Sequence, residues 1–110
     1  MTDTHYPDHW PTATIDTYDS VMAESPELSG AAYQSLVEAC ELLAVAYSLD
    51  AVAKAANYVS KGSMGQDVLH PAVAEARLSR TEAARILARL IGPTSKGQAL
   101  ARARHGGVLR

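Results

Sequence analysis

Phenylalanine is absent from this 110-residue sequence, and tryptophan and cysteine occur once each, as Trp10 and Cys40. A single cysteine excludes a disulfide within the chain and favours a reducing compartment. No apolar run approaches the ~20 residues that a membrane-spanning helix needs. The first eight residues are acidic and polar, which is not typical of a secretory signal. We therefore expect a soluble, cytoplasmic protein with no membrane partner.

Alanine takes the place of the missing large side chains, since 20 of the 110 residues are alanine. Alanine is the best helix former, but it buries little of the apolar area that stabilises a fold, at roughly 25 cal/mol per Å². The length suits one domain with an arm and excludes Rossmann and barrel folds, which need about twice as many residues. We therefore expect a mostly all-α protein with a thin core, of the kind that often depends on oligomerisation.

Proline and glycine positions divide the chain into three parts. Residues 1–12 contain Pro7 and Pro11 and lack a helical period, which predicts an extended N-terminal arm. Residues 13–92 carry helical periodicity and are expected to form a helical core and oligomerisation domain. Residues 93–110 are expected to form a short basic helix and a tail.

The first two helices of the core have recognisable ends. Thr12 or Thr14 is expected to cap a first helix, which ends before Pro26 because the residue preceding proline is pushed out of the α region. A long helix is expected from Gly30 to about residue 60, either continuous or kinked near residues 48–50, where Ser-Leu-Asp offers a new cap. The core is thus a helical hairpin or bundle built around one long helix.

A short connector with two glycines, residues 61–70, follows the long helix. Its composition predicts a loop or a small β-hairpin. Pro71 then stands where proline is favoured, at the first position of a helix, and Gly92-Pro93 is expected to end that helix at Ile91.

The long helix carries two apolar stripes at spacings of three and four residues, one of which includes Cys40 and Tyr47. A helix that is apolar on two faces is buried on two sides, and in so short a chain the second partner is expected to be another subunit. The predicted oligomer interface consists of Leu42, Val45, Leu49, Val52 and Ala56.

Charge is distributed unevenly along the chain. Residues 1–50 contain nine acidic residues and no lysine or arginine, whereas residues 71–110 contain eight basic and two acidic residues. Because lysine and arginine neutralise phosphates, we expect the basic third to bind double-stranded DNA. The expected contacts are Arg77, Arg80, Arg85, Arg89, Lys96, Arg102 and Arg104. The alternative is that the two halves attract each other, within one chain or between subunits, with local pairs such as Glu82 with Arg85.

Residues capable of catalysis are few and scattered. Cys40 lies on an apolar stripe and is expected to be a small buried hydrophobe. Asp67 and His70 share the connector and could form an acid–base pair. The alternative is that Asp67 forms a turn and that His70 is an extended residue before Pro71. Neither Cys-x-x-Cys nor His-Glu-x-x-His occurs. We therefore predict no metal site, no cofactor and no enzymatic activity.

Four segments follow one another in an informative order. They are Ile15-Asp16-Thr17-Tyr18, a long helix with Leu36, Leu42, Leu43 and Tyr47, the His70-Pro71 helix start running to Arg77, and the closing Leu90-Ile91-Gly92-Pro93. In this order and spacing, over residues 12–96, the chain resembles the compact small terminase subunit of tailed bacteriophages. The resemblance implies a non-enzymatic factor that forms homo-oligomeric rings, binds viral DNA in the host cytoplasm and regulates the large terminase subunit. Many small terminases bind DNA through an N-terminal helical domain, but that half is acidic here, so we expect the contact within residues 77–104.

Two other functions remain as alternatives. One is a helical protein-interaction module whose acidic half docks a basic partner. The other is a small helix-turn-helix transcriptional regulator, with residues 78–87 as its first helix and residues 94–100 as its recognition helix. The helical pattern continues to Ile91, which leaves poor room for the turn of about 3–4 residues that this motif needs.

Overall fold

The computed structural model describes residues 5–91 of the chain. Within that range three helices account for 69% of the residues, and a two-stranded antiparallel sheet joins two of them. The elements in chain order are α1 (Thr12–Glu24), α2 (Gly30–Ala55), β1 (Val59–Lys61), β2 (Asp67–Leu69) and α3 (Pro71–Ile91). The expected mostly α-helical fold, with a hairpin in the connector, is confirmed.

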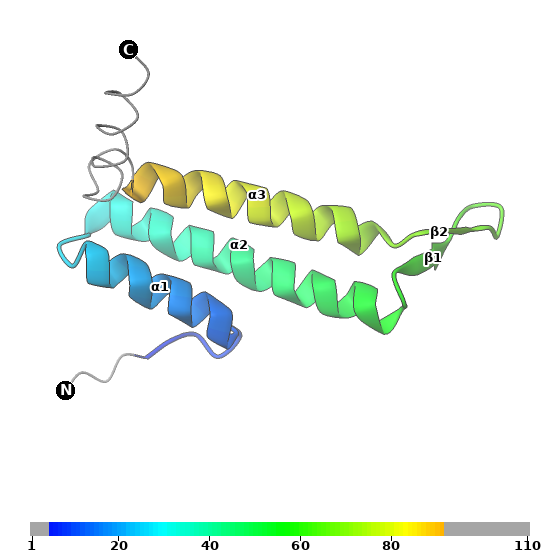
Figure 1. Cartoon of the computed structure of the whole chain (residues 1–110), viewed down its shortest axis with the longest axis horizontal. Coiled ribbons are helices and arrows are strands. Elements are labelled where there is room, and N and C mark those ends of the chain that lie inside the picture. Colours follow the sequence, from blue (N-terminus) through cyan, green and yellow to red (C-terminus); the bar gives the residue numbers. More distant parts are fainter. Residues whose placement is uncertain (1–4, 92–110) are drawn as a thin grey trace, which may run out of the picture.

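The long helix α2 lies between the other two helices (Figure 1). It packs along α3 over most of its length, whereas α1 lies beside its first half. The β-hairpin joins the far ends of α2 and α3 and extends beyond the end of α1. Among the described helices, α3 is therefore the one that covers the distal half of α2.

The start of α1 differs from the expectation. Pro11 is the N-cap and makes no side-chain cap bond, so the predicted capping by Thr12 or Thr14 is wrong. The Pro11 carbonyl accepts instead from the amides of Thr14 and Ile15, at 3.0 and 3.1 Å, and Thr14 is buried. The helix ends at Glu24, ahead of Pro26, as the sequence predicted.

The long helix is continuous from Gly30 to Ala55, so no kink divides it near residue 50, and it ends about one turn earlier than expected. Asn57 and Tyr58 both adopt left-handed backbone conformations, with φ of 55° and 64°. The amide of Asn57 donates to the carbonyl of Lys54, and that of Tyr58 donates to Ala53. This is the Schellman pattern, in which asparagine replaces the usual glycine because it tolerates the left-handed region.

The hairpin is fixed at both of its ends. Val59 pairs with Leu69, and Lys61 pairs with Asp67, where the Lys61 ammonium lies 2.5 Å from a carboxylate oxygen. At the base, the His70 amide donates to the Tyr58 carbonyl at 2.8 Å. Pro71 then opens α3, as predicted, and α3 continues to Ile91, the last of the described residues.

Alanine dominates the contact between α2 and α3. Ala46 and Ala53 on α2 are buried, as are Ala76 and Ala83 on α3, and Ile86 is the largest buried residue of α3. Small side chains allow two helices to approach closely, although each one buries little apolar area. The thin core expected from the composition is confirmed for this pair.

The N-terminal arm is not extended over residues 7–10, which is a correction to the prediction. These residues form a turn in which the Trp10 amide donates to the Pro7 carbonyl, and the Trp10 side chain is only 6% exposed. Its ring joins Val21, Leu36 and Cys40 in a core between α1 and α2. A single large ring fills space that alanines leave open, which explains why the arm folds back.

Candidate nucleic-acid interface

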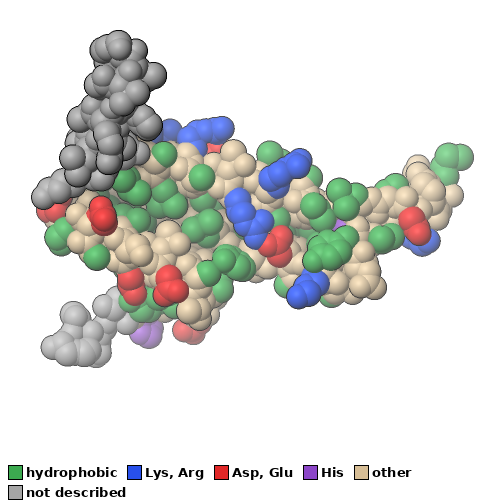
Figure 2. Space-filling model, in the orientation of Figure 1, with side chains coloured by type: hydrophobic (Ala, Val, Ile, Leu, Met, Phe, Trp, Pro, Cys, Tyr) green, Lys and Arg blue, Asp and Glu red, His purple; other side chains and the backbone are tan. Residues whose placement is uncertain are grey.

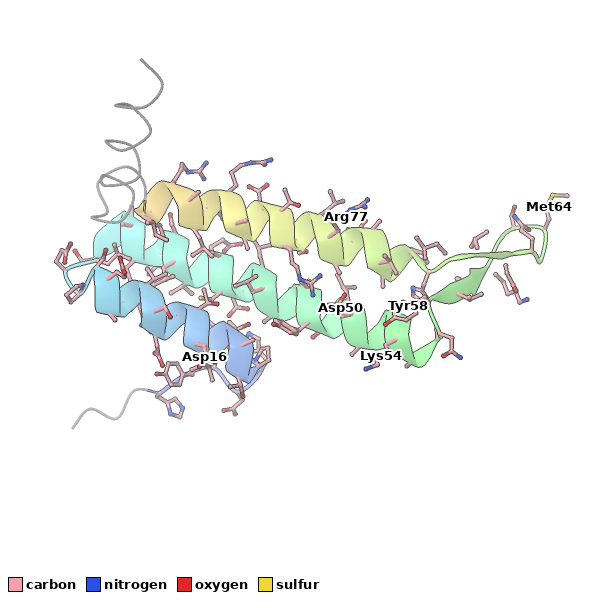
Figure 3. The ribbon with its side chains drawn as sticks, in the orientation of Figure 1. Asp16, Asp50, Lys54, Tyr58, Met64 and Arg77 are labelled. Atoms are coloured by element: carbon pink, nitrogen blue, oxygen red, sulfur yellow. The ribbon has the colours of Figure 1, made fainter. Side chains whose placement is uncertain are left out.

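The outer face of α3 carries a line of arginines. The buried residues of α3 face α2, whereas Arg77, Arg85 and Arg89 recur at intervals of eight and four on the opposite side and are exposed. Figure 2 shows basic side chains along this edge, all of them arginines because α3 contains no lysine, and Figure 3 labels Arg77 on α3. We call Arg77, Arg85 and Arg89 the arginine line.

Two members of the arginine line, Arg77 and Arg89, form no ion pair within residues 5–91. Arg85 donates to Glu82 at 2.9 Å, the local pair that the sequence suggested. Both partners in that pair are about half exposed, so the pair is worth at most ~1 kcal/mol and a phosphate can displace the carboxylate.

Arg80 belongs to a different part of the surface. It forms an ion pair with Asp50 of α2, and its guanidinium carbon lies 5.8 Å from the centroid of the Tyr47 ring. Arg80, one of the predicted DNA contacts, is therefore held against α2 and is not part of the arginine line. The contact joins the acidic and basic halves of one chain, as the alternative reading of the charge pattern anticipated.

The remaining predicted DNA contacts, Lys96, Arg102 and Arg104, lie outside the described residues, as does the recognition helix of the helix-turn-helix alternative. Residues 78–87, the first helix of that alternative, are helical but form the middle of the longer helix α3. The turn that the alternative needs after them is therefore not found before Ile91, the last described residue.

Acidic side chains occupy the opposite edge of the molecule. Asp16, Asp19 and Glu24 are exposed on α1, and α2 separates that helix from α3 (Figure 1). Figure 2 shows aspartate and glutamate gathered around α1, with lysine and arginine around α3. A polyanion that approaches the arginine line is thus separated from these carboxylates by the width of α2.

The predicted oligomer interface is partly covered by the chain itself. Leu42 packs against the cluster of Ala39, Ala83 and Ile86, and Leu49 is half-buried. The other three members are exposed, and among them Val45 is 46% and Val52 is 52% accessible. The open part of the stripe is therefore Val45, Val52 and Ala56.

Apolar side chains on the hairpin were not anticipated. Met64 is 88% exposed at the turn, where Figure 3 places it at the far tip, and Leu69 is 64% exposed. The alternation typical of a half-buried strand is missing from these three-residue strands, so no sequence signal revealed this patch.

The three residues weighed for catalysis are held by structural contacts. Cys40 is fully buried, and desolvation, with a smaller effect from Glu41, raises the pKa of its thiol to about 11. Asp67 bonds to Lys61, and His70 Nδ1 accepts from the Ala72 amide at the start of α3. Across residues 5–91, no three His, Cys, Asp or Glu side chains are grouped as metal ligands.

An aromatic cluster on the arm, α1 and α2 is the site that sequence reasoning missed. The rings of Tyr6, Trp10 and Tyr33 surround that of Tyr18 at centroid distances of 5.9, 5.6 and 6.2 Å. They line a partly open pocket of about 240 Å³. The available signal was that four of the six aromatic residues fall within the first 33 positions.

Glu41 anchors the arm beside this cluster. Its two carboxylate oxygens lie 2.8 and 3.0 Å from His9 Nε2, and one of them accepts from Trp10 Nε1 at 3.0 Å. The hydrogen bond with His9, and to a lesser degree the one from Trp10, lowers the pKa of Glu41 against the opposing effect of burial.

None of the helices within residues 5–91 is at once long and apolar enough to cross a membrane. Comparison with protein-family models, with curated proteins and with solved structures finds no significant match to the chain.

Proposed function

We propose that the protein is a non-enzymatic DNA-packaging factor of the small-terminase type, which binds double-stranded DNA and regulates a large terminase subunit. The observation that supports DNA binding is the arginine line, which is exposed on α3 and separated from the carboxylates of α1 by α2. Lys96, Arg102 and Arg104 extend the same basic character along the sequence. The packaging role rests on the resemblance of residues 12–96 to small terminase subunits.

The proposal includes self-assembly into a ring. The exposed valines of α2 support a contact between copies, because α2 carries two apolar stripes and α1 and α3 leave part of one of them uncovered. Assembly presents several arginine lines to one duplex, which raises the apparent affinity without new contacts in each subunit.

The DNA-binding proposal is tested by replacing two members of the arginine line. We expect wild-type protein to bind any duplex weakly, in the range ~10⁻⁴–10⁻⁶ M per subunit at physiological salt, with affinity that falls steeply as salt rises. The double variant Arg85→Ala/Arg89→Ala should bind all duplexes more weakly and with a smaller salt dependence. Fluorescence anisotropy with a labelled duplex measures both quantities.

A matched control removes the same amount of charge elsewhere. Lys54 lies on α2 and Lys61 on the hairpin, and both are exposed. The variant Lys54→Ala/Lys61→Ala should bind DNA nearly as well as wild type. An equal loss in the two double variants, or no binding at about 50 mM salt, where electrostatic contacts are strongest, would contradict the proposal.

The packaging role needs its own test, because an arginine line alone serves many DNA-binding proteins. A gene for a large terminase subunit, a portal or a capsid protein beside the gene for this chain would support it. Direct evidence would be a change in the ATPase rate of that large subunit when this protein is added. A rate that stays constant over a range of concentrations would contradict the regulatory role.

A second candidate is a helical protein-interaction module. The exposed Met64 at the tip of the hairpin and Leu69 at its base favour it, because apolar side chains exposed along a projecting hairpin can form a contact surface. Met64→Ser distinguishes the two functions. It should leave DNA binding unchanged if the arginine line is responsible, and it should weaken binding to a protein partner if the hairpin is the contact.

A further inference from the structure

The pocket lined by the aromatic cluster has hydrogen-bonding properties that select its ligand. Tyr6 donates its hydroxyl proton to Asp19 at 2.7 Å, and Trp10 donates its indole proton to Glu41 at 3.0 Å. The Tyr18 and Tyr33 hydroxyls bond to each other at 2.7 Å, which uses one of their two protons. His5 also lines the pocket and has one further ring donor when neutral. Most side-chain donors at the pocket are thus engaged within the cluster, whereas the Tyr18 and Tyr33 oxygens and the Asp19 carboxylate keep lone pairs that can accept.

A site of this kind favours a ligand rich in donors. The arginine guanidinium carries five N–H donors and no acceptor. A proline-rich peptide, the other common ligand of aromatic grooves, needs donors from the protein to meet its carbonyl groups. The pocket, at about 240 Å³, also exceeds the roughly 30 Å³ share of one water molecule, so it has room for a planar side-chain head group.

The electrostatic surroundings favour a cation as well. The chain has no lysine or arginine before Lys54, and Asp19 lies at the edge of the pocket, where Tyr6 contacts it. The faces of tyrosine and tryptophan rings attract cations, most strongly when the cation is partly desolvated. The same chemistry occurs elsewhere in this molecule, where Arg80 lies over the ring of Tyr47.

The chain itself contains a suitable ligand. Residues 94–110 include Lys96, Arg102, Arg104 and Arg110 and no acidic residue. We propose that the aromatic pocket binds an arginine side chain from this basic C-terminal segment. The pocket then holds the segment against the acidic edge of the molecule, and the segment must leave the pocket before its arginines can bind any other anion.

The experiment uses full-length protein and a labelled synthetic peptide with the sequence of residues 94–110. In the variant Arg102→Gln/Arg104→Gln/Arg110→Gln the pocket lacks its own ligand, so this variant should bind the peptide several-fold more tightly than wild type does. Fluorescence anisotropy of the peptide gives both affinities. A peptide in which the three arginines are glutamines should bind neither protein.

One pair of variants and one further control locate the contact. Asp19→Asn, made in the triple variant, should weaken peptide binding, whereas Asp16→Asn removes the same charge from α1 away from the Tyr6 contact and should change it little. Arg77→Gln/Arg85→Gln/Arg89→Gln removes three charges from α3 and should leave peptide binding at the wild-type level.

Two results would overturn the inference. One is equal peptide affinity for wild type and for the triple variant, which would mean that the segment does not occupy the pocket. The other is unchanged binding of the arginine-free peptide, which would mean that arginine is not the group recognised. No DNA is present in these measurements, so their failure leaves the proposed DNA-binding function untouched, and the converse also holds.

Discussion

Asn57 decides where the longest helix stops, because its left-handed backbone lets the chain leave α2 and enter the hairpin. Alanine in that conformation costs roughly 1 kcal/mol, whereas glycine adopts it freely. Asn57→Ala should therefore lower the free energy of unfolding by about that amount, and Asn57→Gly should not lower it. Urea denaturation followed by circular dichroism measures both. Equal losses in the two variants would show that the asparagine side chain matters more than the backbone conformation.

Glu41 makes the attachment of the arm depend on pH. Its pKa is lowered in the folded protein, chiefly by the hydrogen bond with His9 and also by the one from Trp10. Its contribution to stability is therefore complete above the ordinary glutamate pKa of ~4.3 and is lost as the pH falls through the lowered folded value. On acidification below pH ~4, Trp10 emission should shift before the helical signal falls. Glu41→Gln should show the shifted emission already at neutral pH, and an emission profile identical to that of wild type would contradict this assignment.

The spacing of apolar residues and the positions of proline predicted most element limits. Pro26 lies just beyond the end of α1, and Pro71 is the first residue of α3, as predicted. The early end of α2 escaped prediction, because the residues after Ala55 continue a helical pattern and only the hairpin requires them to leave it. Local patterns specify helices well, but they do not show where a neighbouring element will interrupt them.

At the scale of elements, the alanine contact between α2 and α3 leaves little room for larger side chains. Ala46 is fully buried at this contact, so Ala46→Leu should destabilise the protein by about 1–3 kcal/mol through overpacking. Ala55→Leu places the same side chain at an exposed position of the same helix and should change stability by less than ~0.5 kcal/mol. Urea denaturation compares them. A stable Ala46→Leu protein would indicate that the two helices can separate without loss.

The candidate sites were predicted less completely than the helices. The arginine line follows from residue spacing on one helix, which sequence displays directly. The Arg80–Asp50 pair and the burial of Trp10 join residues about thirty positions apart, and such contacts depend on how the helices are arranged in space. Residues 7–10 form a turn where the sequence predicted an extended arm. This turn also depends on the packing of the helices, because the buried ring of Trp10 fills space in the core.

At the scale of the whole molecule, the exposed part of the α2 stripe predicts an assembly larger than the 11.7 kDa chain. The variant Val45→Glu/Val52→Glu should shift the mass toward that of a single chain, because charges at an apolar contact lose hydration without a partner. Light scattering at micromolar concentration measures the mass, and circular dichroism verifies that the helices remain.

The control for this variant places the same charges on another part of α2. Ala51 and Lys54 are exposed on a different face of α2 from Val45 and Val52, and Ala51→Glu/Lys54→Glu should leave the assembly intact. Wild-type protein that has the mass of one chain and full helicity would contradict the assembly. An assembly that dissociates equally in both variants would place the contact elsewhere on the helix.

The hairpin between α2 and α3 also has consequences for how the chain folds. Because the turn lies midway between the two helices, contacts near it close short loops, and each further pair along the helices extends a structure already begun. Helix pairing that begins at the hairpin starts with contacts of low sequence separation, which are typical of fast folding. The N-terminal arm must instead close a loop of about thirty residues before Trp10 reaches Glu41. Helical circular dichroism and tryptophan emission therefore report two separate stages, the pairing of the helices first and the docking of the arm afterwards.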